Sequence, residues 1–168
     1  MTHDTKKISG VTTTVIKDVS ALDGRLEEKT TDYYAQVKQD NVWYFGEDTA
    51  TYKKNGNVDS TAGTWMTGVK GAKPGIIMNV DPQITDSHRQ EYLKGEAEDM
   101  YWVIAKNQTI KVPYGTFHNA VLTMEWTPLE PKVASEKYYV PRIGIVAERS
   151  LSGGLENIKL LNVKQNGS

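Results

Sequence analysis

The acidic segment between Arg89 and Asp99 holds the side chains best suited to chemistry. Two short runs of strand-like composition flank a turn there, and a two-residue turn would place Glu91 opposite Glu98. A three-residue turn would place Glu91 opposite Asp99 instead. In either register two carboxyl groups face each other across a hairpin, which is destabilising when both are ionised. The sequence therefore predicts that a neutralising group lies beside Glu91.

Three kinds of group could neutralise this acidic pair, and each implies a different role. Arg89 or a lysine would make the pair an exposed charge ladder without chemistry. A bound calcium ion would use the carboxylates as oxygen ligands. A proton held on one carboxyl would supply the acid and the base of a hydrolase, as in glycoside hydrolysis. The candidate catalytic residues are Glu91, Glu98 and Asp99, and no cofactor other than calcium is suggested.

A second candidate region places aromatic side chains next to acids, in the run Trp43, Tyr44, Phe45, Gly46, Glu47 and Asp48. On a strand, Trp43 and Phe45 would face one side of a sheet and Tyr44 the other. The run is interpreted either as a central strand packed on both faces or as the aromatic wall of a ligand site with an acid at its edge. The candidate ligand-binding residues are Trp43, Glu47, Asp48, Trp65, Arg89 and Trp102.

Composition and motifs exclude several classes of protein. Lysine plus arginine number 20 and aspartate plus glutamate 21, so no basic excess points to a nucleic-acid partner. The absence of cysteine excludes disulfides and thiolate metal sites. No apolar run reaches the roughly 18 residues of a membrane-spanning helix. The sequence contains no Walker loop, nucleophile elbow or dinucleotide fingerprint.

The elements that must position these residues are predicted to be strands. Apolar and polar residues alternate through most of the chain, and turn signals such as Asp23-Gly24 and Asn55-Gly56 separate the runs. This pattern predicts one all-β domain over residues 1–168, an antiparallel meander with little helix that forms a barrel or sandwich, lipocalin-like or half-barrel. Residues 1–8 and 164–168 are predicted to be flexible ends. The glycine-rich segment Gly68–Gly75 is predicted to be an ordered loop near the functional face.

Several segments of the chain, over about residues 25 to 150, resemble a widespread bacterial group of uncharacterised, mostly exported β-rich proteins. They are Asn41–Thr49, Gly63–Trp65 with Gly68, Gly71–Ile76, Arg89–Tyr92 with Gly95–Asp99, Val112–Pro113 with Gly115–Phe117, and Tyr138–Tyr139 with Gly144. The chain departs from the group after the double tyrosine, where it reads Val140-Pro141-Arg142-Ile143-Gly144. The resemblance implies a secreted or periplasmic location and no particular activity. Members of the group usually begin with a signal or lipoprotein leader, whereas this sequence opens without an apolar leader region, which suggests a truncated or naturally short form.

Two functional hypotheses follow. The first is an extracytoplasmic β-domain that binds a small ligand, a glycan or a cation in a groove of the sheet or the mouth of a barrel. The second is a hydrolase whose acid pair includes Glu91 with Glu98 or Asp99, and whose substrate stacks on one of the candidate tryptophans. Neither hypothesis involves nucleic acid or a membrane span, and the sequence leaves the oligomeric state open.

Overall fold

The computed structural model describes residues 4–36 and 40–163, and every regular element in these ranges is a β-strand. The strands are β1 (Thr5–Ile8), β2 (Val11–Leu22), β3 (Arg25–Ala35), β4 (Val42–Tyr52), β5 (Val58–Ser60), β6 (Trp65–Met66), β7 (Lys73–Met78), β8 (Ser87–Arg89), β9 (Glu91–Tyr92), β10 (Met100–Val112), β11 (Gly115–Trp126), β12 (Ala134–Val140), β13 (Gly144–Ser152) and β14 (Asn157–Lys159). The described part of the chain contains no helix, and therefore none that could cross a membrane.

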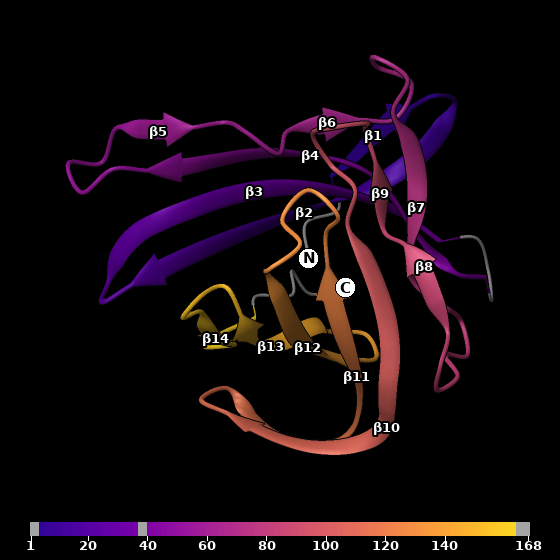
Figure 1. The fold of residues 1–168 in the computed structure, drawn as a ribbon, viewed down its shortest axis with the longest axis vertical. Coiled ribbons are helices and arrows are strands. Elements are labelled where there is room, and N and C mark those ends of the chain that lie inside the picture. The colour runs from indigo at the N-terminus through magenta and orange to yellow at the C-terminus, as the bar shows by residue number, and fades with distance from the viewer. Residues whose placement is uncertain (1–3, 37–39, 164–168) are drawn as a thin grey trace.

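The strands form two antiparallel sheets. The first has the order β1-β2-β3-β4-β7-β9, and the long strand β4 pairs in turn with β7, β6 and β5 along its other edge. The second has the order β14-β13-β12-β11-β10-β8. The two sheets face each other and come together where the chain passes through β7, β8 and β9 (Figure 1). The predicted all-β antiparallel fold is confirmed. Neither sheet closes on itself within the described residues, so the arrangement is a sandwich or half-barrel and not a closed barrel.

The N-terminal end corrects one expectation. Residues 5–8 were assigned to a flexible end, yet they form β1, which pairs with β2 across a tight turn. The reason is burial of Ile8, which is 4% exposed and packs with Val15, Tyr33 and Phe45. Residues 1–3 and the predicted flexible end 164–168 lie outside the described residues.

Small apolar clusters hold the sheets together. In the first sheet, Tyr44 packs with Trp65, Ala72, Leu93 and Ala97 on one side, and the Ile8 cluster lies on the other. In the second sheet, two clusters are centred on the fully buried Tyr101 and on Val146. Such separate clusters leave room between the sheets for side chains that are not apolar.

Gly75 allows the segment that carries Glu91 to approach the first sheet. The segment Gly68–Gly75 was predicted to be a loop, but its last three residues lie in β7 because Gly75 pairs opposite Tyr44 of β4. A Cβ atom on Gly75 would lie 2.4 Å from the carbonyl oxygen of Arg89. The missing side chain therefore lets the backbone immediately before Glu91 pack directly against β7.

The substitution Gly75→Ala is expected to destabilise the fold by about 1–3 kcal/mol or more, because the added methyl group overlaps backbone atoms that have no rotamer to move. The matched control is Gly115→Ala in β11, where a Cβ would meet no atom within 4 Å. Thermal unfolding should show a loss of several degrees for the first variant and almost none for the second. Equal midpoints would show that the close approach at Gly75 does not matter.

Candidate functional site

One wall of the candidate site is the face of the first sheet that looks toward the second. Alternate residues of β3 share this face, so Glu28, Thr30, Asp32 and Tyr34 all line a cleft between the sheets. The register of β3 and β4 places Asp32 opposite Glu47, and Tyr34 opposite Tyr44. The two tyrosine rings stack with centroids 4.8 Å apart, and the Tyr44 hydroxyl donates a 2.5 Å hydrogen bond to Asp32.

A β-bulge at Phe45 brings Glu47 onto this wall. Strict alternation would put Tyr44 and Glu47 on opposite faces, but the register shifts by one residue between the Tyr34–Tyr44 and Tyr33–Gly46 pairs. Both side chains consequently line the cleft. Gly46 makes the bulge possible, since a Cβ at this position would lie 2.6 Å from the carbonyl oxygen of Trp65.

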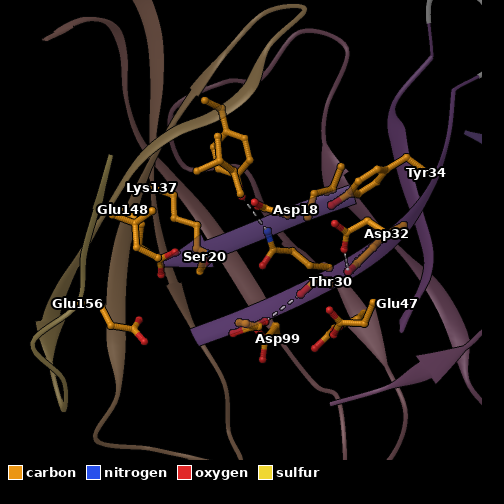
Figure 2. Close-up of a pocket in the computed structure, with 18 residues that line it drawn as sticks. Asp18, Ser20, Thr30, Asp32, Tyr34, Glu47, Asp99, Lys137, Glu148 and Glu156 are labelled. Carbon is orange, nitrogen blue, oxygen red and sulfur yellow. Dashed lines mark hydrogen bonds and ion pairs between the residues drawn. The ribbon is translucent and has the colours of Figure 1, made fainter. Parts of the chain in front are cut away.

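The opposite wall comes from the second sheet and carries a buried lysine. Lys137 of β12 and Glu148 of β13 line the cleft, together with Tyr139, Ile145, Glu156 and Ile158 (Figure 2). The Lys137 Nζ lies 3.0 Å from the Glu125 Oε2 and 3.8 Å from the Glu148 Oε2. Glu125 is 6% exposed and also accepts hydrogen bonds from the hydroxyls of Tyr139 and Thr123. Burial lowers the pKa of Lys137, but the adjacent Glu125 and Glu148 outweigh burial, and the pKa is raised overall.

Glu91 and Asp99 complete the cleft at the junction of the sheets. Leu93 bridges to Ala97, which corresponds to a three-residue loop, and the Gln90 N–H donates to the carbonyl of Asp99 at 2.8 Å. The hydrogen bond continues the Arg89–Met100 pairing and sets Gln90 opposite Asp99, whereas the Leu93–Ala97 bridge is shifted from it by one residue. Glu91 itself pairs with Pro74 of β7, and both Glu91 and Asp99 line the cleft. Glu91 is only 7% exposed, and the Trp65 side chain donates a hydrogen bond to its carboxyl, which forms no ion pair with the described residues.

The cleft has a volume of about 270 Å³ and is strongly acidic. Among the described residues that line it, one cationic side chain, Lys137, stands against eight carboxyl groups: Asp18, Glu28, Asp32, Glu47, Glu91, Asp99, Glu148 and Glu156. Like charges crowded into a partly enclosed space resist ionisation. A neutral proton-bearing form or a positively charged ligand would each relieve this repulsion.

Burial and mutual repulsion change the acidity of these groups. Burial, followed by the charges of Asp99 and Glu47, raises the pKa of Glu91 to about 8, and the nearby Lys137 and Trp65 oppose this only in part. Burial and then the charge of Asp32 raise the pKa of Glu47 to about 8. Burial also raises the pKa of Asp32 to about 6, although the Tyr44 hydroxyl stabilises its ionised form. Part of the cleft is therefore protonated near neutral pH.

The other predicted site residues lie outside the cleft lining. Glu98 accepts a 2.8 Å hydrogen bond from the Gly95 N–H at the tip of the loop. Arg89 stacks its guanidinium 4.5 Å above the ring of Tyr92. Asp48, one residue beyond Glu47, lies on the reverse face of β4 and accepts a hydrogen bond from Tyr33.

The three candidate tryptophans are also absent from the cleft lining, although Trp65 donates a hydrogen bond to Glu91 from behind it. Trp43 packs against the Ile8 cluster on the reverse face, and Trp65 is buried behind Tyr44, with its ring edge-on at 5.4 Å. Trp102 is 39% exposed on β10. The structure therefore brings together Glu47, Glu91 and Asp99 of the predicted residues, and adds residues that the sequence reasoning missed: Asp32, Tyr34, Lys137, Tyr139 and Glu148. The available signal for Asp32 was the polar alternation with Glu28 and Thr30 beside the aromatic pair Tyr33-Tyr34.

No group of three or more histidine or carboxylate side chains in the described ranges is gathered closely enough to hold a metal ion. The carboxyl groups instead extend along the cleft, and calcium binding stays a prediction from the sequence. No protein-family model, curated protein or solved structure matches this chain. The resemblance to exported bacterial proteins thus rests on the sequence motifs.

Replacing the buried Lys137 by an uncharged residue should destabilise the fold. Lys137→Met keeps most of the side-chain volume but leaves Glu125 buried without a counter-charge, which is expected to cost about 3–5 kcal/mol. The control is Lys106→Met, which breaks the 3.3 Å pair with Asp81, a residue whose side chain is 78% exposed; surface pairs are worth about 1 kcal/mol or less. Chemical denaturation measures both, and similar losses would contradict the proposed role of Lys137.

The cleft also predicts how stability depends on pH. A carboxyl whose pKa is raised by folding binds more protons in the folded state, so the free energy of unfolding decreases as pH rises. For Glu91 this decrease extends from its ordinary pKa of 4.5 to about 8, and Glu47 acts over the same range. The melting temperature should therefore fall between about pH 5 and pH 8.5.

The variants Glu91→Gln and Glu47→Gln should flatten this fall, with midpoints close to the parent at pH 5 and higher by on the order of 5 °C at pH 8.5. Glu98→Gln, on the same hairpin but outside the cleft lining, should keep the parental slope. Parallel curves for all four proteins would mean that Glu91 and Glu47 ionise as they do in water.

Proposed function

We propose that this chain is an extracytoplasmic bacterial binding domain that holds a small polar ligand in the cleft between its two sheets. The observation that carries the proposal is the carboxyl of Glu91, which is nine-tenths buried, lines the cleft and forms no ion pair with the described residues, its hydrogen bond being to the uncharged Trp65. A buried carboxyl without a counter-charge costs free energy that a ligand can recover. The family resemblance supports the location outside the cytoplasm.

The composition of the cleft supports the same proposal. Facing sheets in a sandwich usually fill the space between them with apolar side chains. Here acids and tyrosines fill it, which stabilises the fold less than apolar residues of similar size would. Clustered titratable groups with shifted pKa values are typical of functional sites. The volume of about 270 Å³ suits a small molecule and not a macromolecular segment.

Hydrolysis is the second candidate function, and one observation favours it. Glu91 and Asp99 line the same cleft, and the raised pKa of Glu91, about 8, keeps it protonated at neutral pH. Glu91 would donate a proton to the leaving group, and Asp99 would activate water or stabilise positive charge. The tryptophans on which the substrate was expected to stack lie outside the cleft lining, so the substrate would have to stack on the tyrosines.

The two functions are separated by one set of measurements on the purified chain. Thermal shift with a panel of sugars, ammonium compounds and calcium tests binding, since a ligand at about 100 times its dissociation constant adds about 2.7 kcal/mol. We expect one ligand class to raise the midpoint by several degrees in the parent and in the Glu98→Gln control, and not in Glu91→Gln.

A panel of glycosides, esters and phosphoesters, with and without EDTA, tests hydrolysis. Turnover that disappears in both Glu91→Gln and Asp99→Asn would replace the binding proposal with the hydrolase. A panel in which no compound shifts the midpoint at millimolar concentration, or a shift that persists in Glu91→Gln, would contradict binding in this cleft.

A further inference from the structure

We propose that the ligand of the cleft is a linear aliphatic diamine or polyamine, whose separated ammonium groups pair with carboxylates along the cleft. This inference rests on the proposed binding function and names the chemical class of its ligand. It arises from the placement of the charges, from the buried carboxyl of Glu91, which has no ion-pair partner among the described residues, and from the uncharged side chains of the walls.

The sign of the ligand's charge follows from the lining. Of the described lining residues, Lys137 is the one cation, and its ammonium group is already held by Glu125 at 3.0 Å and Glu148 at 3.8 Å. No other ion pair to a lining carboxyl group is formed by the residues that the structure describes. A cleft lined by one sign of charge with low-dielectric walls concentrates ions of the opposite sign.

Glu91 marks a position for one ammonium group. Its carboxyl is nine-tenths buried, accepts a hydrogen bond from the uncharged Trp65 and forms no ion pair within the described chain. Charged groups face it from the neighbouring elements, with Asp99 before β10, Glu47 on β4 and Lys137 on β12. An ammonium ion placed here would donate charge-assisted hydrogen bonds to Glu91, and its three donors could also reach a neighbouring acid.

The spacing of the acids favours a ligand with more than one charge. Figure 2 shows Glu148 and Glu156 on one side of the cleft and Asp32 and Glu47 on the other, with Asp99 between them. The described acids and histidines form no group of three that could surround a single metal ion. Charges distributed in this way match ammonium groups held apart by a methylene chain better than a compact ion.

The uncharged part of the lining suits such a chain. The stacked rings of Tyr34 and Tyr44 present aromatic surface, which attracts ammonium groups and packs against methylenes. Ile77, Ile145 and Ile158 add aliphatic surface. A volume of about 270 Å³ lies just below the usual range of about 300–1,000 Å³ for ligand pockets, as expected for a narrow, unbranched molecule.

Calorimetric titration of the whole chain at pH 8 and 150 mM salt tests the inference. The probes are 1,4-diaminobutane and spermidine, with butylamine, butane-1,4-diol and calcium chloride as comparisons. We expect the two polyvalent amines to bind at least tenfold more tightly than butylamine or calcium, and the diol not to bind. Glu91→Gln and Glu47→Gln should weaken the amines at least tenfold, and Glu98→Gln should leave them unchanged.

A second readout is the proton balance. A cation that binds ionised Glu91 and Glu47 displaces the protons that they hold in the free protein, so titrations in two buffers of different ionisation heat should reveal proton release at pH 7. Glu91→Gln should reduce this release, which a merely electrostatic attraction to the surface would not show.

The outcomes separate this inference from the function on which it depends. If a neutral sugar or the diol binds through Glu91 and the amines do not, the binding function stands and the amine inference is wrong. The same holds if calcium binds more tightly than the amines. If the amines bind equally well to Glu91→Gln, or only at low salt, the contact is adventitious and the inference is wrong. If no probe from either panel binds, both proposals fail.

Discussion

The ammonium group of Lys137 lies among the carboxyl groups that the two sheets enclose, and it determines how much negative charge the interior can hold. It contacts Glu125 at 3.0 Å and Glu148 at 3.8 Å, and its charge also opposes the protonation of Glu91 and Asp99. One positive charge does not balance the eight lining carboxyl groups. The protein must therefore hold protons on some of them or accept a cation from solution.

The backbone of the first sheet decides which acids take part in this balance. The bulge at Phe45 rotates the second half of β4, so that Glu47 joins Asp32 inside the cleft and Asp48 turns to the reverse face. Two acids opposite each other on adjacent strands are unfavourable when ionised. Gly46 makes this arrangement sterically possible, because a Cβ atom there would lie 2.6 Å from the carbonyl oxygen of Trp65. Structural features of this kind usually accompany a site for a ligand or a reaction.

The buried acids of the cleft therefore lower the free energy of unfolding, which is typical of a functional site and not of an apolar core. Apolar clusters around Tyr44, Tyr101 and Val146 supply the cohesion of the two sheets, while the space between the sheets carries acids whose pKa values are raised by burial. The excess of carboxyl groups over cationic groups in the cleft explains both why protons are held there and why a cation would bind and displace them. A ligand that brings positive charge would stabilise the fold and complete the cleft together.

Local pattern was sufficient for the class of fold and for part of the site. Alternation and turn residues predicted antiparallel strands, and the three-residue turn considered after Glu91 is the one that the Leu93–Ala97 bridge closes. Arg89 was one of three groups that could have neutralised Glu91, and in the structure its guanidinium stacks on Tyr92.

The sequence by itself determined which residues form strands and which neighbours share a face, since both depend on contacts within a few residues. Only the tertiary structure decided that Lys137 of the second sheet would face Asp32, Glu47 and Glu91 of the first sheet and its β7–β9 edge. The packing of two sheets is set by their twist and by the apolar clusters that join them, and a single bulge reverses the alternation along a strand. The meeting of distant charges in one cleft therefore carries no local signature in the sequence.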